Sequence, residues 1–299
     1  MPNTLADEIA SLKRVAATRA ARHEHIDDLA WPDGMRIAVN FTLDYDAMLR
    51  RRLSDEPPLQ MAKGEFGGRV GIWRLIELFD HHRVKATVFT PGRICELYPR
   101  SVEAAARSGH EIADHMWEHR VPKEPEVERA HVERCTAALA RLAGRRPVGS
   151  RSGHSASLLR EHGYIYASHR RAGLLPYYLR DDSGGNCLLE LPFGYSIDDA
   201  MYYNFGWLES SNPAQRISDP ERVLELWWAG FLQQYREPAG YYNIVLHPFI
   251  SGRALRIVLL DRLIARMKEL PGVWFPTCEE VARHIIARHP PKAGDAPSI

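Results

Sequence analysis

Two short runs of acidic and histidine residues follow apolar, strand-like segments in this chain of 299 residues. Asp44 and Asp46 flank one tyrosine, and His115 lies four residues before His119. On a helical turn, residues four apart share one face, so both imidazoles could bind one metal ion. One carboxylate with two imidazoles makes an open zinc site with room for water, and the second carboxylate is then free to act as a base on that water. The alternative is a pair of surface histidines at a helix start.

Short β-branched segments alternate with helical patterns along most of the chain, which predicts parallel strands joined by crossover helices. The predicted strands are residues 36–43, 85–90, 111–114, 147–150, 164–168, 187–192, 241–246 and 273–275. The predicted helices are residues 71–82, 99–108, 125–143, 155–161, 220–235, 254–270 and 278–288. About eight strands of this kind favour one α/β barrel over two separate domains.

The expected organisation has three parts. Residues 1–34 contain a polar, charged helix over 5–30 and form an N-terminal helical extension, residues 35–288 form the barrel, and residues 289–299 form a loose tail. Two long stretches, 45–68 and 194–219, are predicted to be non-helical, and loops of that length in a compact domain are usually functional. Aromatic residues between 195 and 207 could cover a small pocket or pack on the barrel rim.

The reacting groups of a barrel enzyme stand where its strands end and in the loops that follow. Asp44, His115, Arg151 and His247 all follow predicted strands at that position. Two carboxylates placed together there would repel each other, and burying them without a cation is costly. The position of Asp44 and Asp46 therefore favours a metal ion at this end of the barrel.

The composition argues against several partners. The chain has 39 Lys and Arg against 38 Asp and Glu, a formal net charge of +1, which makes nucleic acid or an acidic membrane surface an unexpected main partner. Charged residues interrupt the N-terminus and every long apolar run, so we expect neither a signal peptide nor a membrane span, and a cytoplasmic protein. The four cysteines form no C-x-x-C pair and are expected to be reduced.

Residues 41–46, 109–119 and 244–248 together resemble the polysaccharide deacetylase (NodB-homology) superfamily, whose members are carbohydrate esterases with a distorted (β/α) barrel. The Asp-x-Asp pattern, with residues 68–74 and 272–275, is most similar to the subgroup of PuuE-type allantoinase, cyclic imide hydrolases and Helicobacter-type peptidoglycan deacetylase. The resemblance spans roughly residues 35–288.

The resemblance implies a role for each candidate site residue. Asp46, His115 and His119 would bind a divalent metal, most readily Zn²⁺, with Co²⁺, Mn²⁺ or Ni²⁺ as alternatives. Asp44 would be the general base and His247 the general acid, and Arg151 would hydrogen-bond the base. The sequence departs from the family where a proline usually follows this arginine after one residue, and where an acidic residue supports the acid. Asp198 or Asp199 could replace that acidic residue.

The expected activity is metal-dependent hydrolysis of a non-peptide carbon–nitrogen bond. A small amide or imide inside the cell is favoured over an N-acetylated glycan, because no secretion signal precedes the barrel. The resemblance also implies a homo-oligomer. Two alternatives remain open from sequence, namely a metal-independent ureide hydrolase like allantoinase and a catalytically silent binding protein of the same fold.

Overall fold

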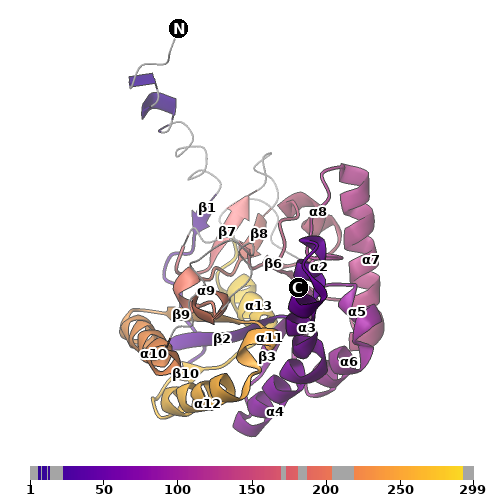
Figure 1. Cartoon of the computed structure of the whole chain (residues 1–299). Helices are drawn as coiled ribbons and strands as arrows, with labels where there is room; N and C mark the ends of the chain where they lie inside the picture. The colour runs from indigo at the N-terminus through magenta and orange to yellow at the C-terminus, as the bar shows by residue number, and fades with distance from the viewer. Residues whose placement is uncertain are drawn as a thin grey trace.

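The computed structural model describes residues 6, 7, 9–11, 13, 23–169, 173–180, 187–203 and 219–291. Its strands are β1 (His23–His25), β2 (Ile37–Asp44), β3 (Ala86–Thr90), β4 (Glu111–Asp114), β5 (Gly149–Ser150), β6 (Tyr166–Ala167), β7 (Tyr177–Arg180), β8 (Cys187–Glu190), β9 (Gly240–Leu246) and β10 (Val273–Trp274). The sheet order is β1-β7-β8-β6-β5-β4-β3-β2-β10, and β9 pairs with β2. Figure 1 shows helices packed around this sheet.

Crossover helices surround the sheet as the alternating sequence pattern predicts. The main ones are α4 (Ile72–His82), α6 (Pro99–Arg107), α7 (Pro125–Ala143), α8 (Ala156–Glu161), α10 (Pro220–Arg236), α12 (Ala254–Lys268) and α13 (Cys278–Arg288). Shorter elements are α2 (Leu49–Leu53), α3 (Pro58–Phe66), the π-helical turn η1 (Gly67–Gly71), α5 (Ile94–Leu97), η2 (Tyr195–Ile197), α9 (Ala200–Tyr203) and α11 (Pro248–Ser251).

The sheet closes into a distorted barrel. All ladders from β10 through β2, β3, β4, β5 and β6 to β8 are parallel, and so is the ladder between β2 and β9. In the described part of the chain no ladder joins β8 to β9. A single bridge between Asp198 and Val245 instead brings the segment after β8 against β9. The predicted α/β fold of the distorted (β/α) barrel type is confirmed.

Strand β2 shows how the sequence pattern builds both the core and the site. Its eight residues are all buried. Because side chains alternate along a strand, Phe41 and Leu43 belong to the core beneath the helices, while Asn40, Thr42 and Asp44 share the opposite face. Thr42 donates to the carbonyl of Ile244 on β9 (2.8 Å), which satisfies its buried hydroxyl. A polar row thus runs inside the barrel toward its C-terminal end.

Two expectations about local structure were wrong, and one strand was missed. His23–His25 forms an edge strand antiparallel to β7 and not part of a helix over 5–30; most of residues 5–22 lie outside the described residues. Residues 45–68 are largely helical, because α2 and α3 occupy them. Strand β7 was not predicted, and it is stabilised by pairing with β1 and β8 on either side. Each of these elements depends on a distant partner that local patterns do not reveal.

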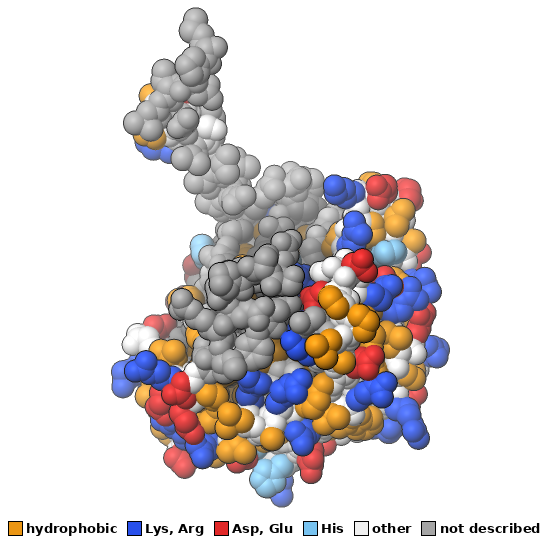
Figure 2. Space-filling view, in the orientation of Figure 1, with side chains coloured by type: hydrophobic (Ala, Val, Ile, Leu, Met, Phe, Trp, Pro, Cys, Tyr) orange, Lys and Arg blue, Asp and Glu red, His pale blue; other side chains and the backbone are white. Residues whose placement is uncertain are grey.

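The described surface in Figure 2 carries Lys and Arg interspersed with Asp and Glu, together with separate hydrophobic groups. None of the helices in the described part of the chain has the length and apolar character needed to cross a membrane. All four cysteines are buried and lie outside any disulfide bond in the described chain, in agreement with the expected thiols. Residues 292–299, the larger part of the predicted tail, lie outside the described residues.

Candidate metal and catalytic centre

The C-terminal end of β2 supplies two of the candidate residues. Asp44 is the last residue of the strand, and the amide of Tyr45 continues the pairing by donating to the carbonyl of Phe89 (2.9 Å). The chain then leaves the sheet in a tight turn, with Ala47 in the left-handed region (φ 47°). Asp46 is therefore not constrained by strand alternation, and its fully buried carboxylate turns toward the loop after β4.

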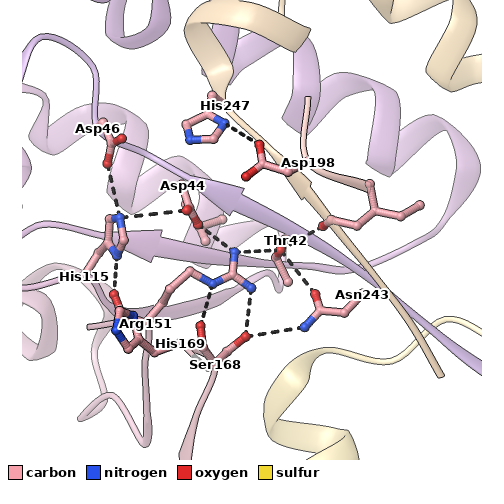
Figure 3. Close-up of polar contacts among 12 residues, drawn as sticks. Thr42, Asp44, Asp46, His115, Arg151, Ser168, His169, Asp198, Asn243 and His247 are labelled. Atoms are coloured by element: carbon pink, nitrogen blue, oxygen red, sulfur yellow. Dashed lines mark hydrogen bonds and ion pairs between the residues drawn. The ribbon is translucent and has the colours of Figure 1, made fainter. Parts of the chain in front are cut away.

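Asp46, His115 and His119 converge as a triad. The Nε2 atom of His115 lies 3.3 Å from Asp46 Oδ1, and the Nε2 atom of His119 lies 3.4 Å from Asp46 Oδ2. The two imidazole rings meet edge to face, with their centroids 4.8 Å apart. These three ligand atoms are close enough together to hold a single ion. Figure 3 shows Asp46 and His115 pointing toward each other beside Asp44.

The two histidines do not lie on a helical turn, contrary to the expectation from their spacing. They lie in a non-helical turn after β4, in which Met116 (φ 68°) and His119 (φ 59°) both adopt the left-handed conformation. The turn is held by Asp114, whose Oδ1 accepts from the Met116 amide (3.1 Å). Convergence of the imidazoles therefore depends on two backbone conformations that L-residues adopt reluctantly.

The polar atoms of this triad fit a divalent metal ion. Within the described part of the chain, neither carboxylate oxygen of buried Asp46 has a hydrogen-bond partner, and the Nε2 atom of buried His115 has none either. Leaving buried polar atoms unpaired is expensive, and a shared cation would satisfy all of them at once. Burial lowers the pKa of His119, which favours the neutral imidazole that a metal requires. One carboxylate and two imidazoles match the ligand set of an open zinc site.

Arg151 connects the Asp44 carboxylate to the barrel interior. Its Nη1 donates to Asp44 Oδ1 (2.7 Å) and to the Thr42 hydroxyl (2.9 Å), and its Nε and Nη2 donate to Ser168. The guanidinium is buried and lies over the Phe89 ring at 4.1 Å from its centroid. Burial alone would raise the pKa of Asp44, but the charges of Arg151 and His115 bring it below its ordinary value. Asp44 is thus an ionised, oriented carboxylate.

The same arginine also orients His115 through its backbone. The Nδ1–H of His115 donates to the Arg151 carbonyl, and because a carbonyl can only accept, Nδ1 must carry the proton. The other ring nitrogen, Nε2, then faces Asp46. A hydrogen bond of this kind to the outer nitrogen fixes the ring orientation of a metal ligand. Sequence reasoning had linked Arg151 to Asp44 alone.

His247, the residue after β9, is held by Asp199. The two oxygens of Asp199 accept from the His247 ring Nδ1 (2.6 Å) and backbone amide (2.8 Å), and Oδ2 also accepts from the Ser251 hydroxyl (2.5 Å). Asp198 lies farther from the ring, with Oδ1 at 3.8 Å from Nδ1. The sequence left Asp198 and Asp199 as alternatives, and the structure places Asp199 in direct contact. Figure 3 shows His247 near Asp44 with Asp198 beside it.

Backbone contacts fix the turn that follows His247. A Cβ atom on Gly71, at the end of η1, would lie 1.9 Å from the carbonyl oxygen of Pro248. The same approach places the Gly71 Cα 2.3 Å from a Cβ on Gly252, so the two segments pack without side chains between them.

The Gly71→Ala change should therefore disturb both stability and the site. Forcing the backbones apart should cost about 1–3 kcal/mol of unfolding free energy and shift Pro248 beside His247. Both the thermal unfolding temperature and kcat should decrease. Gly230→Ala, in the interior of α10, is the matched control, because an added Cβ would lie 3.2 Å from the Tyr242 hydroxyl oxygen and would meet no backbone atom. It should leave kcat unchanged and should change stability less than Gly71→Ala does. Equal behaviour of the two variants would contradict this prediction.

Comparison with known proteins agrees with this architecture. The family model described as polysaccharide deacetylase matches residues 66–167, a range that contains His115, His119 and Arg151. A crystal structure from Mycobacterium smegmatis, assigned as a polysaccharide deacetylase, is 32% identical over 91% of this chain and 98% of that chain, with a TM-score of 0.79. The chain belongs to the polysaccharide deacetylase family.

Other relatives of this deacetylase-family chain differ in their named activities. Peptidoglycan deacetylase of Helicobacter pylori is 26% identical over 86% of this chain and 98% of its own length. PuuE allantoinase superposes with a TM-score of 0.77 and 25% identity, covering 87% of this chain and 93% of that chain. The family consists of hydrolases of amide carbon–nitrogen bonds, which confirms the predicted enzyme class.

Proposed function

We propose that this chain is a divalent-metal-dependent hydrolase of non-peptide carbon–nitrogen bonds, with Asp46, His115 and His119 as the metal ligands. The observation that carries the proposal is the buried Asp46 carboxylate, whose two oxygens each face an imidazole nitrogen and have no hydrogen-bond partner among the described residues. Zn²⁺ is the ion that this ligand set favours, and Co²⁺, Mn²⁺ and Ni²⁺ are alternatives. Three retained ligands argue against the metal-independent alternative.

The chain's own residues then supply acid and base. A divalent ion at such a site polarises a carbonyl oxygen and brings the pKa of a coordinated water toward ~7. Asp44 takes a proton from the attacking water as the new carbon–oxygen bond forms. The guanidinium of Arg151 keeps Asp44 ionised and turned toward the site through its 2.7 Å hydrogen bond. The Oδ2 atom of Asp44 lies 3.9 Å from His115 Nε2, so the proposed base lies directly beside a proposed metal ligand.

His247 completes the reaction by protonating the departing nitrogen when the carbon–nitrogen bond breaks. Its Nδ1–H is committed to Asp199, so Nε2 is the atom that can transfer a proton toward substrate. Burial lowers the pKa of His247, but the carboxylates of Asp199, Asp198 and Asp44 together raise it to about 10, with Asp199 contributing most. His247 is therefore protonated at neutral pH, as a general acid must be. The products are a carboxylic acid and an amine or amide.

The substrate that we propose is a small amide or cyclic imide. The named relatives include both a peptidoglycan deacetylase and an allantoinase, so the family alone does not choose between polymer and small molecule. Part of the aromatic segment that could close a pocket, including Phe205 and Trp207, lies outside the described residues. A substrate screen therefore has to decide.

The test is a hydrolysis screen of N-acetylated sugars, peptidoglycan fragments, cyclic imides, hydantoins and allantoin, with the enzyme either loaded with Zn²⁺ or treated with a chelator. We expect turnover of a small imide or amide by the loaded enzyme alone. Equal turnover after chelation would establish the metal-independent alternative instead. Turnover of glycans alone would contradict the small-substrate proposal. Absence of hydrolysis for every compound would favour a catalytically silent binding protein.

Replacing Asp199 with asparagine should alter the pH dependence of this activity. The variant keeps the shape of the side chain but removes the charge that raises the pKa of His247, so the remaining burial lowers that pKa. Because His247 acts only while protonated, the alkaline limb of kcat/KM should move to lower pH, by at least about one unit. Asp198→Asn is the matched control and should produce a smaller displacement. If the alkaline limb of the kcat/KM profile stays at the same pH in the Asp199 variant, His247 is not the general acid.

A further inference from the structure

A second cluster of metal-ligating side chains lies on the outside of the barrel, between α4 and α12. His81 and His82 are the last two residues of α4, and Asp261 lies within α12. The His82 Nε2 atom is 2.7 Å from Asp261 Oδ1, and the rings of His81 and His82 meet edge to face at 5.1 Å between centroids. One ligand atom from each of the three residues lies within 4.8 Å of the others.

The chemistry of this cluster matches that of the catalytic triad. Both consist of two imidazoles and one carboxylate, the donor set that suits Zn²⁺ and related transition ions better than Mg²⁺ or Ca²⁺. In a tetrahedral zinc site with bonds of about 2.0–2.1 Å, neighbouring ligand atoms lie about 3.3 Å apart. The ring of His81 is exposed and the carboxylate of Asp261 is half exposed, so both side chains have room to rotate toward that spacing.

The surroundings of the cluster also favour a cation. The histidines occupy the C-terminal turn of α4, where the helix dipole is negative. An open groove of about 1010 Å³ between the two helices is lined by His81 from α4 and by Ala254 and Ile257 from α12, so His81 is accessible from solvent. At the same end of α4, the Lys268 ammonium donates to the His82 carbonyl (2.7 Å), which fixes the backbone of this turn but also places one positive charge nearby. His82 itself is mostly buried, so one ligand is already oriented.

We propose that His81, His82 and Asp261 form a second zinc site that ties α4 to α12. The proposal is independent of the catalytic one, because the cluster belongs to the helices that follow β2 and β9 and not to the C-terminal ends of those strands. An ion there would join two crossover helices that already pack on each other. Its expected effect is on stability, since a ligand that binds only the folded state raises the unfolding temperature.

The test measures Zn²⁺ content and thermal unfolding of the full chain in parallel. The wild type should bind two Zn²⁺ ions, whereas the His81→Ala/His82→Ala and Asp46→Asn/His119→Ala variants should bind one each. In the second of these variants, Zn²⁺ at 100 times its Kd should raise the unfolding midpoint by about 5 °C, and chelation should reverse the rise. The added His81→Ala/His82→Ala change should abolish it.

Matched controls separate this site from general zinc binding by histidines. His284 and His289 also lie close, with ring centroids 6.5 Å apart, but no carboxylate completes a triad with them in the described chain. Their double alanine variant should still bind two ions. If the His81/His82 variant folds poorly, the isosteric Asp261→Asn change should weaken Zn²⁺ binding by about tenfold or more.

Two results would overturn the proposal. One is an unchanged Zn²⁺ content in the His81/His82 variant; the other is an Asp46/His119 variant that binds no ion and shows no thermal response to Zn²⁺. A different result would show that the catalytic proposal is wrong. In that case the Asp46/His119 variant would keep both ions, and the proposal of an outer site would be unaffected. Metal content and unfolding temperature, rather than activity, therefore decide the question.

Discussion

Replacing Asp44 with asparagine should lower kcat by about 10²- to 10⁴-fold, the usual contribution of a positioned general base. The amide keeps the shape of the side chain and can still accept from Arg151, so the barrel should remain folded. It has no basic oxygen to take the proton from water. The measurement is kcat on the best substrate from the screen, over a pH range wide enough to exclude a simple displacement of the profile.

Metal content distinguishes loss of the base from loss of the metal site. Asp44 is not one of the three triad ligands, so the Asp44→Asn variant should bind as many Zn²⁺ ions as the wild type. Asp55→Asn is the matched control, because Asp55 is an exposed aspartate of the same segment and should keep full activity. Retention of more than about a tenth of wild-type kcat in the Asp44 variant would remove this residue from the role of base.

Removing the metal should have an effect of similar size. Chelation of the wild type, or His119→Ala, should lower kcat by roughly 10³-fold, because the several kcal/mol that an ion supplies to the charged transition state are lost. Added Zn²⁺, Co²⁺, Mn²⁺ or Ni²⁺ should restore the chelated wild type but not the variant. His162→Ala, which alters a histidine outside both triads, is the control. Full activity in metal-free protein would instead identify an allantoinase-like, metal-independent enzyme.

The outer zinc site affects how such experiments are interpreted. If His81, His82 and Asp261 hold an ion, a content of one Zn²⁺ per chain does not show that the catalytic triad is filled. If the outer site binds Zn²⁺ more tightly than the catalytic triad does, activity should appear only when a second equivalent of Zn²⁺ is added. The variants described above resolve this ambiguity, since each removes one triad and leaves the other intact.

Local sequence patterns predicted most of the regular structure. The predicted strand 111–114 coincides with β4, and the predicted helices 125–143 and 278–288 coincide with α7 and α13. Their signals are local, such as proline at the first turn of α7 and the capping box of Thr277 and Glu280 at the start of α13. Such signals act within a few residues, so they can be recognised without knowledge of the fold.

Elements that depend on distant partners escaped sequence reasoning. The polar strand β1 exists because β7 offers it a free edge, and α3 packs where its Gly64 can approach the backbone of Ala47. A Cβ on Gly64 would lie 2.5 Å from the Ala47 carbonyl oxygen, a constraint between the end of α3 and the turn before α2. No local pattern encodes a contact of this kind.

For the site itself, the sequence determined which residues are present and that they follow strand ends, so a parallel barrel had to gather them at one end. Only the tertiary structure decided how they meet. The left-handed turn at Met116 and His119, rather than a helix, aims both imidazoles at Asp46. Asp199, rather than Asp198, binds His247, because the segment after β8 pairs with β9 at Asp198 and turns the next side chain inward. Hydrogen-bond geometry depends on the path of the backbone, and that path is fixed by packing across the whole barrel.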